Sequence, residues 1–206
     1  MAENFFLDNL DLQFHLKNTD LRQVVALREK NYAFNEKYLA APRHYEDAQD
    51  NYRRILTVLG DICANVVAPR AAEADEVGAQ FHDGKVEYSP ATQEALAAFK
   101  QADLMGSMLP WEYGGMNLPE TIYQMMVEIV SRAEAGLMTI FGLLEIALAI
   151  NEFGDEAMKA RILPPPELSR RSVMATAADS SSPSRAADWT GAVVAPPASA
   201  TDDPAH

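Results

Sequence analysis

Apolar residues recur at three- and four-residue intervals over much of the chain, most regularly in two runs. The first run begins near His44 and ends at Pro69, and the second follows Pro119. This spacing predicts amphipathic helices, because it places the apolar side chains on one face that a core can bury. The first stripe comprises Tyr52, Ile55, Leu56, Leu59, Ile62, Cys63, Val66 and Val67, and the second Ile122, Met125, Met126, Ile129, Val130 and Ala133.

Capping residues predict where other helices begin. Asp20 is expected to start a helix that runs to about Leu39. Ser89-Pro90 is typical of a helix start, since the hydroxyl caps the first turn and proline costs nothing at the first position. That helix should bury Ala95, Leu96, Phe99 and Ala102.

Two further helices are predicted towards the end of the pattern. The run from Gly136 to Ile150 is apolar almost all round, so neighbours are expected to surround it. Asp155 and Glu156 suit the start of a short helix that reaches about Leu163. Residues 76–88 and 104–118 are predicted to be irregular. Strand-like alternation is nearly absent, so the fold class is predicted to be all-α, a helical bundle of about five to six helices.

The chain is predicted to have three segments: residues 1–45 with one helix, residues 46–163 with the remaining helices, and residues 164–206. Composition marks the start of the third segment. From Pro164 onward Ala, Ser and Pro dominate and large aliphatic residues nearly vanish. Such a segment buries too little apolar area to offset its ordering entropy, so residues 164–206 are predicted to be a disordered low-complexity tail.

The net charge of −13 limits the partners that we expect. Nucleic acid and anionic membrane surfaces are both recognised through clustered Lys and Arg, so neither is predicted. The N-terminus lacks the pattern of a signal peptide, and the run 136–150 is shorter than the ~20 residues of a bilayer span. With Cys63 as its only cysteine, the chain is expected to be a soluble protein of the reducing cytoplasm.

The sequence offers little chemistry of its own. His15, His44, His82 and His206 are scattered, without the ligand spacing of a metal site, so no metal is predicted. Cys63 lies on an inner stripe and is predicted to be a small buried hydrophobe. Gly114-Gly115 lacks the spacing of a phosphate-binding loop and is predicted to be a turn. No catalytic, cofactor-binding or metal-binding residue is therefore assigned.

Residues 109–163 nevertheless carry an ordered set of motifs. Pro110-Trp111-Glu112-Tyr113-Gly114-Gly115 comes first, followed by Glu128–Ala135, which reads Glu-Ile-Val-Ser-Arg-Ala-Glu-Ala. Residues 153–159 then read Phe-Gly-Asp-Glu-Ala-Met-Lys, before Leu163-Pro164. Together these motifs resemble the N-terminal domain of the acyl-CoA dehydrogenases, and residues 1–45 look like the N-terminal extension of some branches.

The resemblance implies an oxidoreductase of fatty acid metabolism. Such flavoproteins desaturate acyl-CoA thioesters, use FAD, form homo-oligomers and take their catalytic Glu from a C-terminal domain. After Leu163-Pro164 this sequence departs from the family pattern, which continues into a β-domain. We therefore expect a truncated chain that does not bind FAD tightly by itself, and whether it is an enzyme stays uncertain. Residues from Pro165 are hypothesised to be an out-of-frame reading, which the coding DNA would test.

The same resemblance places five residues where family members line the acyl-chain cavity: Met138, Thr139, Gly142, Leu143 and Ile146. The simpler interpretation is that these residues fill the core, because packing is the commoner reason for an apolar stripe. Glu145, the one charge in this run, is expected to be solvated or paired, since unpaired carboxylates are seldom buried.

A rival prediction belongs to another class of function. The chain is then a non-catalytic helical interaction protein, whose apolar helices bind a partner and whose tail is flexible. A domain that binds acyl-CoA without oxidising it is a third possibility, but no basic patch for the CoA phosphates is visible.

Overall fold

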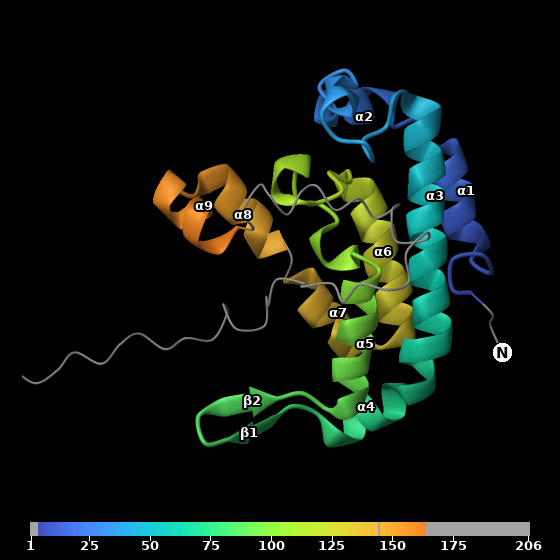
Figure 1. Ribbon diagram of the computed structural model, residues 1–206. Coiled ribbons are helices and arrows are strands. Elements are labelled where there is room, and N and C mark those ends of the chain that lie inside the picture. Colours follow the sequence, from blue (N-terminus) through green and yellow to red (C-terminus); the bar gives the residue numbers. More distant parts are fainter. Residues whose placement is uncertain (1–3, 144, 164–206) are drawn as a thin grey trace, which may run out of the picture.

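The computed structural model describes residues 4–143 and 145–163. Figure 1 shows a helical bundle in which α3 forms one side, α1 lies outside it, and α5 and α6 lie inside. The α-helices are α1 (Leu10–Asn18), α2 (Arg22–Arg28), α3 (Tyr45–Ile62), α4 (Ala71–Val77), α5 (Pro90–Gln101), α6 (Glu120–Ala133), α7 (Ala135–Gly142), α8 (Glu145–Phe153) and α9 (Glu156–Ile162). Two short strands, β1 (Gln80–His82) and β2 (Lys85–Glu87), pair as a hairpin.

The predicted all-α fold class is confirmed. The core consists largely of the stripes of α3, α5 and α6, as their periodicity predicted. Leu56 and Leu59 of α3, Phe99 of α5, and Ile122 and Met126 of α6 are fully enclosed. Burial of these side chains stabilises each helix far more than helix propensity does.

The prediction of one helix in residues 1–45 is wrong. This segment holds both α1 and α2, and α2 ends at Arg28 rather than near Leu39. The helix ends because Lys30, Asn31 and Tyr32 all adopt positive φ, and a short 3-10 helix, Ala33–Glu36, follows. The segment belongs to the same core as the helices after it, through buried side chains that include Phe6, Leu12, Leu16 and Val25.

Pro69 does not end the helical path that begins with α3. A π-helical turn, Cys63–Val67, and a 3-10 turn, Ala68–Arg70, connect α3 to α4. Proline lacks an N–H and clashes with the preceding turn of a regular α-helix. Here the changed hydrogen-bond register of the π and 3-10 turns accommodates the proline. Sequence spacing alone does not predict this change.

The stretch predicted to be irregular at residues 76–88 contains the β-hairpin. Phe81 pairs with Val86, and the turn is Asp83-Gly84 with both residues at positive φ. Asp-Gly in this conformation is the favoured two-residue hairpin turn. Each strand has only three residues, and all of them are exposed. The sequence therefore shows no alternation of buried and exposed positions that would have predicted the strands.

The helix predicted over Gly136–Ile150 is divided into α7 and α8, and the expectation that neighbours surround it is wrong. Leu137 and Phe141 of α7 are buried, whereas Leu143 and Ile146 are about half exposed. None of the described residues Glu145–Phe153 is buried. Figure 1 shows α8 and α9 beside the bundle rather than inside it.

Two helical stretches, Tyr45–Val77 and Ala135–Phe153, meet the length and composition criteria of a membrane span. Core helices of soluble proteins meet the same criteria, and the buried stripe of α3 explains the first stretch. The second stretch contains the exposed apolar face that is described below.

The start of α5 supplies a stability prediction. The Ser89 hydroxyl accepts a hydrogen bond from the Thr92 amide at 3.1 Å, and Pro90 occupies the first turn, as predicted. Ser89→Ala is expected to lower the free energy of unfolding by about 1 kcal/mol, because it leaves the partly buried Thr92 N–H without its cap. Chemical denaturation would measure the loss. Ser89→Asp should restore most of it, since a carboxylate caps equally well.

Candidate functional site

The five residues that the resemblance assigned to the acyl chain lie on α7, at its end and on the start of α8. Thr139, Leu143 and Ile146 are exposed, while Met138 and Gly142 are partly exposed. Met138 packs against the edge of the core, so core filling applies to this residue alone among the five. The set therefore includes an apolar surface, because Leu143 is 47% and Ile146 51% exposed.

Aromatic packing fixes the orientation of α7. Phe141 is fully buried, stacks on Tyr123 of α6 with ring centroids 5.7 Å apart, and meets the edge of Phe99 of α5 at 5.6 Å. Tyr123 Oη also donates to the Phe141 carbonyl at 3.1 Å. Burial raises the pKa of Tyr123, so its hydroxyl stays protonated as this donor. With one face of α7 held in the core, the remaining faces are left outside.

The N-terminus of α7 is fixed by its own cap. The Glu134 carboxylate accepts hydrogen bonds from the Gly136 amide, at 2.6 Å, and from the Leu137 amide. A carboxylate is favourable here because helix N-termini carry unpaired N–H groups and partial positive charge. Glu134 lies within the Glu128–Ala135 motif, so that motif sets where α6 ends and α7 begins.

Exposed apolar side chains continue beyond α7. Phe153 at the end of α8 is 86% exposed, and Met158 of α9 is 39% exposed. Glu145 lies on the exposed side of α8, in agreement with its expected solvation. We refer to Leu143, Ile146, Phe153 and Met158 as the α7–α9 surface. Exposed apolar side chains that gather in one patch commonly mark a site that another protein element or a ligand covers.

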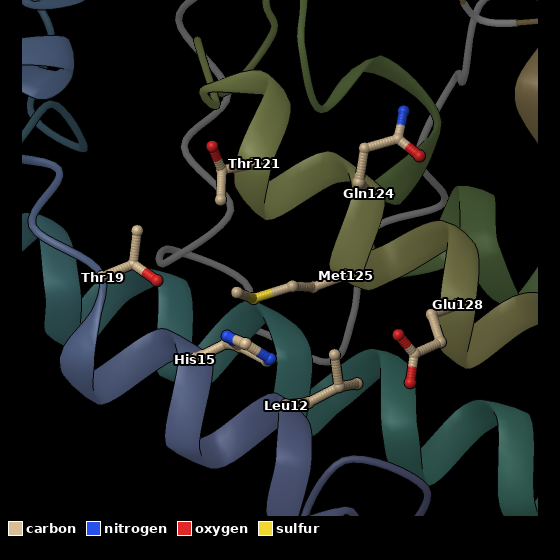
Figure 2. Close-up of a pocket in the computed structure, with 7 residues that line it drawn as sticks. All are labelled: Leu12, His15, Thr19, Thr121, Gln124, Met125 and Glu128. Carbon is tan, nitrogen blue, oxygen red and sulfur yellow. The ribbon is translucent and has the colours of Figure 1, made fainter.

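Two pockets in the described part of the chain have linings that do not include the residues of the α7–α9 surface. Figure 2 shows the first, of about 260 Å³, between α1 and α6, with Met125 across from His15 and Thr19. It is lined by Leu12, His15, Thr19, Thr121, Gln124, Met125 and Glu128. The second, of about 360 Å³, is lined by Arg28, Pro110 and Asn117 together with Leu148, Asn151 and Glu152 of α8. The predicted acyl-facing residues line neither pocket.

The glycine pair of the motif loop and the two pockets do not fit a flavin. Gly114-Gly115, the glycine pair of the Pro110–Gly115 motif, is packed rather than open, since a Cβ on Gly115 would lie 2.0 Å from the Leu109 carbonyl oxygen. Backbone N–H groups at such a turn therefore do not form a phosphate cradle. The two pockets also fall at the small end of cofactor sites, which reach about 1,000 Å³. No reaction step through FAD follows from these residues.

Other candidate chemistry in residues 4–143 and 145–163 is equally limited. His, Cys, Asp and Glu side chains form no group of three or more that could hold a metal ion among these residues. Cys63 is fully buried, and desolvation raises the pKa of its thiol to about 12. A thiol with so high a pKa is a poor nucleophile, so Cys63 is a core residue, as its position on the stripe predicted.

Sequence reasoning missed Arg28 and Glu29. Glu29 is 2% exposed, and both residues bind the loop that carries the Pro110–Gly115 motif. An Arg-Glu pair near the end of an amphipathic helix ordinarily indicates a solvated face. The one available signal was Trp111, since a buried indole N–H requires an acceptor.

The comparisons with known proteins agree with the motifs. Residues 49–166 match the protein-family model described as the N-terminal domain of acyl-CoA dehydrogenase. A curated relative, 3-methylmercaptopropionyl-CoA dehydrogenase from Ruegeria pomeroyi (strain ATCC 700808 / DSM 15171 / DSS-3), is 28% identical over 116 residues. That match covers 54% of this chain and 19% of the relative. The chain therefore belongs to the acyl-CoA dehydrogenase family, and its match lies in the helical N-terminal domain of that family.

Proposed function

We propose that this chain is the front helical domain of an FAD-dependent acyl-CoA dehydrogenase, and that its α7–α9 surface faces the acyl chain and the rest of the enzyme. Met138, Thr139, Gly142, Leu143 and Ile146 would contact the acyl chain of a CoA thioester. The flavin and the catalytic carboxylate would come from other parts of the assembled enzyme, and the 206-residue chain alone would be inactive. Homo-oligomers and a cytoplasmic location are part of the same proposal.

One observation carries the proposal: the helix pair that follows the Glu128–Ala135 motif leaves Leu143 and Ile146 half exposed. A surface Cβ on Gly142 would meet nothing within 4 Å, so the backbone there is open to a close neighbour. Apolar area left in water costs roughly 25 cal/mol per Å², and a covering acyl chain or protein segment would recover that free energy.

The cofactor part of the proposal has a direct test. The full chain would be purified with added FAD, desalted, and examined by visible absorption. We expect no stoichiometric flavin band and no bleaching with an acyl-CoA, because the described residues do not form a flavin cradle. A yellow protein that bleaches with acyl-CoA would overturn this part of the proposal.

The α7–α9 surface predicts association in its uncovered state. We expect the full chain to self-associate with rising concentration in size-exclusion chromatography, and the double variant Leu143→Gln/Ile146→Gln to elute as a monomer. Leu39→Gln is the matched control, because Leu39 is 94% exposed and lies outside this surface. Wild-type chain that is monodisperse at all concentrations would contradict the proposal.

A non-catalytic helical interaction protein is the alternative, and the same surface favours it. Such a protein evolves to be stable without its partner and would be monodisperse in that chromatography experiment. Binding of acyl-CoA without oxidation is a third reading, for which titration of the full chain with an acyl-CoA gives the test.

A further inference from the structure

The Pro110–Gly115 motif lies in the loop of residues 104–118, between α5 and α6. The end of α2, far away in the sequence, binds this loop. Glu29 accepts two hydrogen bonds from this loop, one from Trp111 Nε1 and one from Asn117 Nδ2, both at 2.9 Å. Arg28 donates to the Asn117 carbonyl at 2.9 Å and to the Met108 carbonyl at 3.1 Å. The two charged residues therefore bind the loop at three of its residues.

Asn117 is the centre of this network. It is 6% exposed and adopts φ of 53°, in the left-handed region. Its Nδ2 also donates to the Arg28 carbonyl at 3.0 Å, and its own amide donates to the Leu109 carbonyl at 2.9 Å. Asparagine tolerates left-handed backbone better than most residues, but at some cost, which these contacts offset.

Trp111 is held on two sides. Its indole N–H is bound by Glu29, and its ring stacks on Tyr38 with centroids 6.2 Å apart and an angle of 23° between planes. Tyr38 follows the left-handed residues Lys30, Asn31 and Tyr32, which turn the chain back after α2. The strained turn thus brings Glu29 and Tyr38 to the same indole.

Burying Glu29 is unfavourable without these partners. Desolvation raises the pKa of this carboxyl, while the hydrogen bonds from Trp111 and Asn117 and the charge of Arg28 oppose the shift. The loop also carries a cost of its own, since the Ser107 hydroxyl is the side-chain group found buried without a hydrogen-bond partner in the described residues. A loop with such costs needs contacts from outside itself to stay in one conformation.

We propose that Glu29 is a positioning residue, and that the segment from Arg28 to Tyr38 is a fixed seat for the Pro110–Gly115 loop. Arg28, Pro110 and Asn117 line the 360 Å³ pocket together with residues of α8, so the seat also places the loop residues that face this pocket. The inference depends on the proposed function only for the role of α8. The N-terminal segment then positions the motif loop and is not merely an extension of the domain.

The test uses the full chain with Trp189→Phe, which leaves Trp111 as the only tryptophan. In this background we compare Glu29→Ala with Glu112→Ala, a matched control because Glu112 is an exposed carboxylate of the same loop. For Glu29→Ala we expect red-shifted Trp111 emission, and amide hydrogen exchange in residues 106–118 faster by about tenfold. Exchange in α3 and α6 should stay unchanged. The control should leave emission and exchange at wild-type values.

Two further variants separate positioning from general destabilisation. Glu29→Gln keeps one acceptor oxygen for two donors, so its loop exchange should fall between wild type and Glu29→Ala. Trp111→Phe removes the indole N–H but keeps a ring on Tyr38, so it should also accelerate exchange in residues 106–118. Equal acceleration in α3 and the loop, or no change in the loop, would overturn the proposal. Neither readout involves FAD or acyl-CoA, so its failure is distinct from failure of the proposed function.

Discussion

Phe141→Ala is expected to lower the free energy of unfolding by about 3–5 kcal/mol, the usual cost of removing a fully buried phenylalanine. The ring is completely enclosed and contacts both Phe99 and Tyr123, so its loss leaves a cavity between α5, α6 and α7. The hydrogen bond that Tyr123 Oη donates to the backbone carbonyl of residue 141 should be retained, since the substitution leaves that carbonyl in place. Urea denaturation followed by circular dichroism would measure the change.

Phe153→Ala is the matched control for this prediction, because Phe153 is 86% exposed at the end of α8. Surface substitutions away from special contacts usually change stability by less than about 0.5 kcal/mol. We therefore expect nearly wild-type stability. Equal losses in the two variants would mean that Phe141 does not anchor α7 in the core, and the orientation of the α7–α9 surface would then lack its support.

Gly115→Ala is the second substitution with a large expected effect. A Cβ at this position would lie 2.0 Å from the Leu109 carbonyl oxygen and 2.6 Å from the Gly106 carbonyl oxygen. Both obstacles are backbone atoms, so no flexible side chain can move aside. We expect a loss of about 3 kcal/mol or more in the free energy of unfolding, at the upper end for overpacking.

Gly142→Ala controls for the loss of a glycine as such. Nothing lies within 4 Å of a Cβ at this position, the last residue of α7. Alanine is favoured over glycine in helices, so stability should stay unchanged or rise by up to about 1 kcal/mol. If Gly115→Ala were as well tolerated as Gly142→Ala, Gly115 could not be packed as closely against the Leu109 carbonyl as described.

Several predicted elements appear in the structure because local rules decided them. The stripes of α3 and α6 are buried as predicted. Their apolar residues repeat with the period of a helix, so they lie on one face, which the core covers. The starts of α5 and α9 follow from Ser89 and Asp155, whose side chains cap the next turn. Such caps depend only on neighbours in sequence.

The errors arose where distant contacts outweighed local preference. Asp20 and the apolar residues after it suggested one long helix, but the backbone turns left-handed at residues 30–32, next to Glu29 and its bonds to Trp111 and Asn117. Pro69 suggested a helix end, but a π turn carries the path onward. The apolar run 136–150 suggested a central helix, yet its α8 half lies at the surface.

The candidate site divides in the same way. The motifs from Pro110 to Lys159 identified the family and five candidate acyl-facing residues, because the order of short motifs can be read from the sequence without knowing the fold. Their exposure could not be predicted, since an apolar helix with a covering neighbour and one without it have the same sequence. The predictions for residues 164–206 lie outside the described residues.

The sequence by itself determined the all-α class, the faces of α3, α5 and α6, and the family, because helical periodicity, caps and motif order are local properties. Only the tertiary structure decided that α1 and α2 contribute side chains such as Leu12 and Val25 to the core, that Glu29 binds the motif loop, and that Leu143 and Ile146 lie exposed. These three facts depend on contacts between residues far apart in sequence. Whether a side chain is buried depends on the partner that packing supplies, which no local pattern contains.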